Sequence, residues 1–210
     1  ARTALFNYLF TKVHNGKFLI RIEDTDRVRW NKKAEDAIFD GLAWLGISAG
    51  EPPLSQYSRR ERHVEVAHSM IKNGTAYRCY LSQEEYRENK RIYENTNLGE
   101  KYLSPWRDNL KVNNKPHVIR LKAPILGNTT ISDIVQGSIS WKNKDLDDFV
   151  IVRANGDPTY MLSVVVDDWD MKITHIIRGD DHLTNAARQS LIFAANNWTL
   201  PNFAHIPLIH

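Results

Sequence analysis

Apolar residues recur at helical spacing in the first third of the chain. Leu5, Leu9 and Val13 fall on one face of a helix that Gly16 ends. Two further amphipathic segments follow an apolar run. The predicted elements are a helix over 3–15, a strand over 17–22 and helices over 34–45 and 59–72. This alternation of helix and strand is typical of an α/β fold.

The middle third has a different pattern, with short alternating segments between polar stretches. Ser82–Glu85 has the form of a capping box and opens a polar helix. Short strands are predicted over 76–80, 117–121, 129–134, 138–141 and 149–153. Short strands joined by turns favour an antiparallel sheet, so we expect a mixed α+β insertion here.

The helix and strand pattern returns in the last third. An apolar segment over 159–166 precedes a strand over 173–177, a helix over 183–196 and a strand over 203–209. The outline is an α/β unit interrupted by an insertion. For the α/β unit we expect a doubly wound parallel sheet.

Charged residues stand where two predicted strands end. The two sets are Glu23, Asp24 and Asp26 after FLIRI, and Arg178, Asp180 and Asp181 after ITHII. In a doubly wound sheet, ligands bind beyond the carboxyl ends of the strands. One such strand alone is as well explained by an acidic surface turn, but two of the same form favour a binding site.

Tyr160 follows the turn sequence Asn155–Pro158 and begins an apolar segment. A tyrosine at this point either brings its hydroxyl to the wall of a cleft or packs in the core. The residues alone leave both interpretations open.

Other kinds of site lack their signatures. Asp24–Asp26 resembles the start of a calcium loop, but Val28 and Trp30 stand where oxygen ligands and glycine belong. There is no glycine-rich dinucleotide fingerprint and no P-loop. His63 and His68 are outside the i, i+4 spacing of a helical zinc pair, so we expect both on a helix surface. A carboxylate pair for sugar hydrolysis is possible on paper but disfavoured, because nothing in the sequence fixes the separation of the two groups.

The composition is that of a soluble globular protein, with 42% hydrophobic and 25% charged residues among 210. A single cysteine, Cys79, excludes an intrachain disulfide and a cysteine-rich zinc site, and it suits a reducing compartment. No apolar run reaches the roughly 18 residues of a membrane span, and no signal peptide is visible. Since the chain begins at Ala1 in a predicted helix and ends at His210 after a predicted strand, we expect a fragment.

The net charge of +3 is concentrated in one region. Residues 86–115 contain seven Lys or Arg and four acids, a balance of +3, so the rest of the chain sums to zero. Tyr86, Tyr93, Tyr102 and Trp106 lie among these charges. A basic surface with interleaved aromatic side chains suits RNA, and a solvated charged surface explains the composition equally well.

Several segments, in one order, resemble a known family. ARTALFNYLF, GKFLIRIEDTDR, AEDAIFDGLAWLGI, KPHVIRLKAP, LDDFVIVRANGDPTYMLSVVVDDWDMKITHIIRGDDHLTNAARQ and FAHIPLIH are similar to the catalytic half of bacterial glutamyl-tRNA synthetases, which are class I aminoacyl-tRNA synthetases. The resemblance covers the whole chain and is weakest over 87–115. It implies a Rossmann-like catalytic domain over 1–74 and 150–210, interrupted over 75–149 by a connective domain that grips the tRNA acceptor end.

The activity that the resemblance implies is ATP-dependent. Such enzymes join L-glutamate to ATP, release pyrophosphate and pass the glutamyl group to the 3'-terminal ribose of tRNA. The implied partners are L-glutamate, ATP with its Mg²⁺, tRNA(Glu) and, in some members, tRNA(Gln). A cytoplasmic monomer without membrane contact is expected, and no zinc, since Cys79 alone cannot build the cysteine-rich zinc site that some members carry.

The resemblance also assigns roles to single residues. Glu23 matches the carboxylate that receives the α-ammonium group, Arg178 the guanidinium that pairs with a substrate carboxylate, and Tyr160 a hydroxyl that lines the glutamate pocket. The remaining implied roles are ATP-ribose contacts for Asp180 and Asp181, tRNA contacts for Lys101, Arg107 and Lys111, and anchoring of Arg27 or Arg29 by Asp24 and Asp26.

The departures from the family pattern are equally specific. The histidine signature that holds ATP phosphates is expected just before Ala1 and the lysine loop just after His210, so no residue of this chain is assigned a catalytic role. The chain alone is expected to show little or no glutamate-dependent ATP–pyrophosphate exchange. The alternatives are a glutaminyl-tRNA or glutamyl-queuosine tRNA synthetase relative, a non-catalytic RNA-binding paralogue, and an unrelated α/β domain with a small-molecule site.

Overall fold

The computed structural model describes residues 2–25, 31–97 and 100–209. The first part of the chain alternates helix and short strand, as predicted. Its elements are α1 (Arg2–Val13), β1 (Arg21–Ile22), α2 (Lys32–Trp44), β2 (Leu54–Ser55), the 3-10 helix η1 (Tyr57–Arg59) and α3 (Arg60–Lys72). The predicted strand over 17–22 is shorter than expected, because only its last two residues pair with β2, a strand that the apolar pattern did not reveal.

The middle part contains every short strand that the sequence predicted. Its elements are β3 (Ala76–Cys79), α4 (Gln83–Thr96), β4 (Val118–Leu121), β5 (Asn128–Asp133), β6 (Gly137–Lys142), η2 (Asn143–Asp145) and β7 (Val150–Val152). The predicted capping box is present at the start of α4, where Ser82 and Glu85 each accept the other's backbone N–H.

The last part returns to alternation. Its elements are α5 (Tyr160–Asp170), β8 (His175–Gly179), η3 (Asp180–His182), α6 (Leu183–Ala195) and β9 (Asn202–Ile206). The apolar segment that the pattern left unassigned is α5. Its residues 162–168 are all buried, which explains why no amphipathic period was visible.

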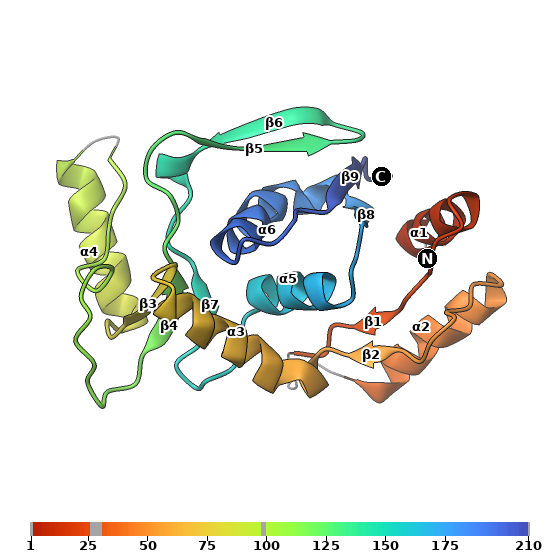
Figure 1. Cartoon of the computed structure of the whole chain (residues 1–210), viewed down its shortest axis with the longest axis horizontal. Helices are drawn as coiled ribbons and strands as arrows, with labels where there is room; N and C mark the ends of the chain where they lie inside the picture. Colours follow the sequence, from red (N-terminus) through yellow and green to blue (C-terminus); the bar gives the residue numbers. More distant parts are fainter. Residues whose placement is uncertain (1, 26–30, 98–99, 210) are drawn as a thin grey trace.

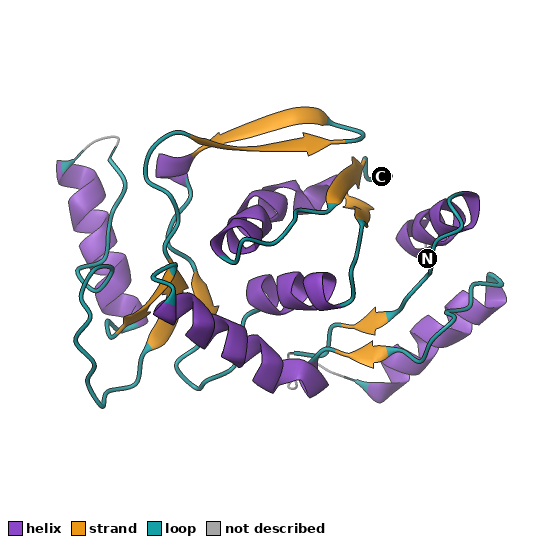
Figure 2. Ribbon diagram, in the orientation of Figure 1, coloured by secondary structure: helices purple, strands orange, loops and turns teal. Residues whose placement is uncertain are grey.

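The α/β class is confirmed, and the parallel strand pairs occur in more than one sheet. The described strands form three sheets, ordered β1-β2, β3-β4-β7 and β6-β5-β9-β8 (Figure 2). The pairs β1–β2, β8–β9 and β5–β9 are parallel, whereas β3, β4 and β7 are antiparallel. The sheet that contains β8 and β9, the last strands of the chain, is therefore extended by the β5–β6 hairpin from the middle of the chain.

The core joins the middle and last parts of the chain. Helix α6 packs on β5 and on α5, and α5 packs in turn on α3 (Figure 1). One hydrophobic cluster includes side chains of α3, the β3-β4-β7 sheet, α5 and α6, among them Met70, Ile151, Leu162 and Ile192. Residues 75–149 thus share a core with their neighbours. The domain borders near 74 and 149 stay a prediction.

Candidate functional site

Three predicted residues from distant parts of the chain lie in one electrostatic cluster. Glu23 follows β1, Tyr160 begins α5 and Arg178 lies on β8. Burial raises the pKa of the Tyr160 hydroxyl, Glu23 raises it further, and Arg178 opposes the rise. Burial lowers the pKa of Arg178, against the attraction of Tyr160, Asp168 and Glu23. The charge of Glu23 acts on both Tyr160 and Arg178, so the three side chains belong to one cluster.

Two residues without a predicted role complete this cluster. The guanidinium of Arg21 donates from Nη1 to Oδ1 of Asp168 at 2.8 Å, and its Nη2 lies 3.5 Å from Oε1 of Glu23. Burial works to lower the pKa of Arg21, but Asp168, Glu23 and Asp167 together raise it. Arg21 is the one charge inside the apolar run 18–22, and this isolated charge was the signal that sequence reasoning passed over.

Asp168 is the buried carboxylate of the cluster. Its burial raises its pKa to about 6, although Arg21 and Arg178 favour the charged form. Glu23 adds to the rise as a neighbouring negative charge. The quoted segment VVVDD contained this residue, but nothing in the pattern distinguished it from Asp167.

Asp167 ties α5 to the start of α3. Its carboxylate accepts hydrogen bonds from Nε of Arg59 (2.6 Å) and Nε2 of Gln56 (3.0 Å), and it lies 2.8 Å from Nε2 of His63. The prediction that His63 lies on a helix surface is wrong: the side chain is fully buried, because this carboxylate supplies a partner inside the protein. His68 is exposed, as expected.

Asp24 organises the turn after β2. It accepts a hydrogen bond from Oγ of Ser55 and another from the backbone N–H of Tyr57, both at 2.8 Å. It therefore fixes the end of β1 to the chain beside it. The predicted partners Arg27 and Arg29, and Asp26 itself, lie outside the described residues.

The guanidinium of Arg178 donates hydrogen bonds from two of its three nitrogens. Its Nε donates to Nε2 of His205 at 3.0 Å, and its Nη2 donates to Oε1 of Gln189 at 2.8 Å and to the carbonyl of His182 at 3.4 Å. Within the described part of the chain, Nη1 makes no hydrogen bond. His205 was visible in the sequence as a polar residue inside the apolar run FAHIPLI.

The two acids after Arg178 lie on η3. Asp181 is exposed, with Oδ2 at 3.7 Å from Nε2 of His182, and it contributes to the electrostatic environment of Arg178. Asp180 is partly buried. Gly179 separates them from Arg178, and a Cβ on this glycine would collide with the carboxylate of Asp181. Because Asp181 is exposed and its carboxylate can turn away, this contact alone does not require glycine at the position.

Two of the three predicted tRNA-contacting residues have another role. Lys101 and Arg107 both pair with Asp148, whose side chain is 1% exposed, and the side chain of Lys101 is itself 3% exposed. Burial lowers the pKa of Lys101, against the attraction of Asp148. We therefore correct the prediction for these two residues, because their charges are directed into the protein rather than towards a phosphate.

Lys111 differs from them in being exposed. It lies between Leu110, which is 92% exposed, and Val112, which is 69% exposed. Its position is compatible with the predicted contact to tRNA.

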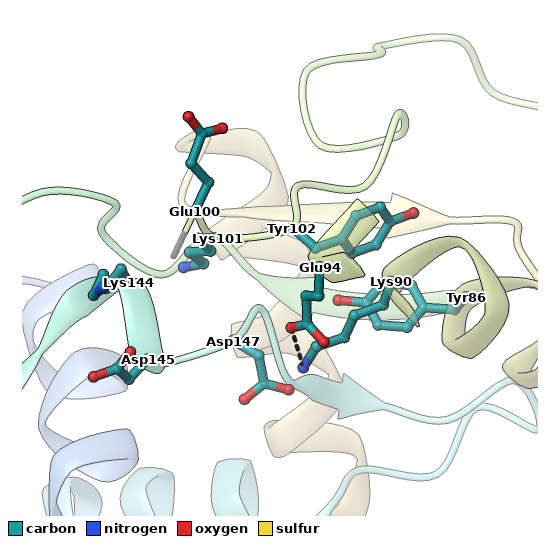
Figure 3. A pocket seen from close by; sticks show the side chains of 9 residues that line it. All are labelled: Tyr86, Lys90, Glu94, Glu100, Lys101, Tyr102, Lys144, Asp145 and Asp147. Atoms are coloured by element: carbon teal, nitrogen blue, oxygen red, sulfur yellow. Dashed lines mark ion pairs between the residues drawn. The ribbon is translucent and has the colours of Figure 1, made fainter. Parts of the chain in front are cut away.

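A cavity of about 360 Å³ lies on the predicted connective region, between α4 and the segment after β6 (Figure 3). It is lined by Tyr86, Lys90, Glu94, Glu100, Lys101, Tyr102, Lys144, Asp145 and Asp147. Three lysines face four acids, and Lys90 pairs with Glu94. The mixed charge does not suit a phosphate group, and none of the residues around Arg178 lines this cavity.

The described residues contain no group of three or more His, Cys, Asp or Glu side chains arranged to hold a metal ion. No described helix combines the length and the apolar character that crossing a membrane requires.

Known proteins match the chain over its whole length. The model of the family described as tRNA synthetases class I (E and Q), catalytic domain, matches residues 1–210. Glutamate–tRNA ligase 2 of Paracoccus denitrificans is 55% identical over 215 residues, which are 100% of this chain and 45% of the relative. The glutamate–tRNA ligase of Caulobacter vibrioides is 53% identical over 214 residues, which are 100% of this chain and 44% of the relative.

Solved structures agree. The crystal structure of a glutamate tRNA ligase from Elizabethkingia meningosepticum in complex with its amino acid has a TM-score of 0.86 and 33% identity, and the match covers 99% of this chain and 46% of that one. The glutamate-tRNA synthetase from Elizabethkingia anophelis has a TM-score of 0.86 and 32% identity, and the match covers 100% of this chain and 47% of that one. The chain thus spans less than half the length of these relatives.

The Asp148 cluster predicts a loss of stability. Replacing Asp148 with Asn should lower the free energy of unfolding by about 3–5 kcal/mol, because two buried cations lose their counter-charge. Urea denaturation measures this. Asp145→Asn is the matched control: this neighbouring side chain is exposed, so its substitution should change stability by about 0.5 kcal/mol or less. Equal stability of the two variants would contradict the burial of both cations against Asp148.

Asp168 predicts a pH dependence. Its pKa in the folded protein is about 6, above the ordinary 3.8, so the folded state binds this proton more tightly than the unfolded state. The contribution of Asp168 to the free energy of unfolding should fall as pH rises from about 4 to about 6, and stay constant above that. The measurement is the difference in the free energy of unfolding between the wild type and Asp168→Asn, taken across this pH range. A difference that is flat with pH excludes the raised pKa, and Asp40→Asn, on an exposed helix position, serves as control.

Proposed function

The chain belongs to the family of class I tRNA synthetase catalytic domains for glutamate and glutamine, and from this premise we propose that the protein containing it is a glutamate–tRNA ligase. The relatives compared above all carry that name, which favours glutamate over glutamine as the amino acid. The proposal concerns the whole protein, since the chain spans less than half the length of those relatives.

The observation that carries the proposal is the cluster of Glu23, Tyr160 and Arg178. A free amino acid presents an ammonium group and carboxylates, so its site needs an anion, a cation and a polar wall on rigid elements. The half-exposed carboxylate of Glu23 suits the α-ammonium group, and Nη1 of Arg178 suits a carboxylate oxygen. The hydroxyl of Tyr160 suits the wall between them.

The reaction proceeds in two steps. An α-carboxylate oxygen of glutamate attacks the α-phosphorus of ATP, which forms glutamyl-adenylate and releases pyrophosphate. A ribose hydroxyl of the tRNA 3' end then attacks the glutamyl carbonyl carbon, and AMP leaves. Mg²⁺ accompanies ATP as a counter-charge to its phosphates. The residues of this chain contribute by orienting the amino acid, and Asp180 and Asp181 by contacting the ATP ribose.

Residues 75–149 are proposed to contact the tRNA acceptor end. With Lys101 and Arg107 turned inward, the cations that can meet phosphates are exposed ones of this region, among them Arg87, Lys111 and Lys115. We propose tRNA(Glu) as the substrate, with tRNA(Gln) as the second tRNA to compare, and a cytoplasmic monomer that holds no zinc.

Glutamate-dependent exchange of pyrophosphate into ATP by the full-length protein tests the function. Activity with glutamate and not with glutamine supports it. Exchange with glutamine alone would instead indicate a glutaminyl-tRNA synthetase. Binding of tRNA without any exchange would indicate an RNA-binding paralogue.

The amino-acid site predicts a selective effect on glutamate. Glu23→Gln and Arg178→Ala in the full-length protein should each raise the KM for glutamate by about 10- to 100-fold, because a hydrogen bond to a charged group is worth about 1.5–3 kcal/mol. Tyr160→Phe should have a smaller effect. The KM for ATP should change little, and exposed Glu84→Gln serves as control. An unchanged glutamate KM in both charge variants would remove these residues from the site.

The tRNA contact predicts a change in salt dependence. Lys111→Gln should weaken tRNA binding and reduce the slope of log K against log salt by about one phosphate contact. Filter binding at several salt concentrations measures the slope. Exposed Lys33→Gln on α2 is the control, and a slope equal to that of the control would exclude a contact by Lys111.

A further inference from the structure

His205 is a fully buried histidine next to the proposed amino-acid site. It lies on β9 directly opposite Arg178 of β8 in the parallel register. Its Nε2 accepts a hydrogen bond from Nε of Arg178 at 3.0 Å, and its Nδ1 lies 2.6 Å from Oδ2 of Asp133. The imidazole therefore bridges a guanidinium and a carboxylate.

Only one form of the ring satisfies both neighbours. The carboxylate of Asp133 accepts, so Nδ1 must carry the proton, and Nε2 must offer its lone pair to the N–H of Arg178. A proton on Nε2 would make the ring N–H of His205 face the Nε–H of Arg178, so that two donors would meet without an acceptor. Burial lowers the pKa of His205, and Arg178 and His182 act in the same direction while Asp133 opposes them. The neutral ring with its proton on Nδ1 is the form that fits.

Asp133 is itself fixed in orientation. Its Oδ1 accepts the backbone N–H groups of Val135 and Gln136, each at 2.9 Å, and the carboxylate also accepts the backbone N–H of His205. It ends β5, the strand that the middle of the chain adds to the sheet beside β9. A strand of the predicted connective region thus sets the state of a ring next to the substrate arginine.

The bonds of Arg178 leave one nitrogen for a ligand. Nε is taken by His205 and Nη2 by Gln189 and the carbonyl of His182, so Nη1 is the nitrogen without a partner in the described chain. Losing the bond at Nε would leave the guanidinium held at Nη2 alone, so that the group could turn about that point. The direction of Nη1 then depends on His205.

We propose that His205, kept in its Nδ1-protonated form by Asp133, is a positioning residue that aims Nη1 of Arg178 at a carboxylate of the amino-acid substrate. The assignment rests on the proposed function, in which Arg178 binds that carboxylate. His205 and Asp133 are both buried, and the hydrogen bonds between them and to Arg178 are the route by which they act.

Asp133→Asn tests the role of the proton. The amide oxygen has to remain where Val135 and Gln136 donate, which places the amide NH₂ opposite Nδ1 of His205. Nδ1 must then accept, the ring proton moves to Nε2, and it opposes the Nε–H of Arg178. Ring ¹⁵N shifts of histidine-labelled full-length protein should show the proton on Nδ1 in the wild type and on Nε2 in the variant. A wild-type ring protonated on Nε2 overturns the proposal.

Two substitutions at His205 form a matched pair that differs by one methylene. His205→Gln can place an amide oxygen where Nε2 accepts from Arg178, whereas His205→Asn reaches only the position of Nδ1. We expect His205→Asn and Asp133→Asn to raise the KM for glutamate by about 10- to 100-fold and to leave the KM for ATP unchanged. Removing the partners that orient metal ligands has effects of this size. His205→Gln should stay nearer to the wild type than His205→Asn. The pair decides the question even if Asp133→Asn does not fold.

Arg178→Ala separates this proposal from the function on which it rests. If Arg178→Ala leaves the glutamate KM unchanged, the proposed role of Arg178 fails. If Arg178→Ala raises the glutamate KM but His205→Asn and Asp133→Asn do not, the role of Arg178 stands and the positioning role of His205 is excluded. Adding His205→Asn to Arg178→Ala should cause no further loss, because both act through one guanidinium.

Discussion

The parallel register of β8 on β9 is the constraint on which the proposed site depends. It places Arg178 opposite His205, so that a largely buried guanidinium finds an acceptor within the sheet itself. A buried charge without partners is costly, and the structure offsets this cost on two edges of the group with neutral acceptors rather than with carboxylates. The positive charge is thereby oriented but not neutralised, as binding of an anionic ligand requires.

Helix α5 provides the second constraint through two successive carboxylates. Neighbouring residues on a helix point in directions about 100° apart, so Asp167 and Asp168 reach different parts of the chain. Asp167 bonds to Arg59 of η1 and lies against His63 of α3, and Asp168 bonds to Arg21 of β1. The same helix begins with Tyr160. The position of Tyr160 relative to Glu23 is therefore set by buried polar contacts as well as by apolar packing. A shift of α5 would disturb both the Asp167–Arg59 pair and the Asp168–Arg21 pair.

The sequence predicted the elements well and the partners of charged residues poorly. Charges at the ends of apolar runs led to Glu23 and Arg178, because a strand end is a local feature. Lys101 and Arg107 were read as a basic surface, since nothing local shows that Asp148, far along the chain, lies between them. The same holds for His63, whose burial depends on Asp167. Burial of a polar group is decided by a distant partner, and one sequence does not reveal which pairs meet.

The middle of the chain is part of the structure that holds the proposed site in place. Its last hairpin is hydrogen-bonded into the sheet of β8 and β9, and its other sheet shares a core with α3, α5 and α6. Asp133 comes from this hairpin and is held by backbone N–H groups on both sides of the β5–β9 contact. β5 cannot shift along β9 without losing those bonds. The region proposed to bind tRNA and the arginine proposed to bind glutamate are therefore joined by a continuous path of hydrogen bonds through Asp133 and His205.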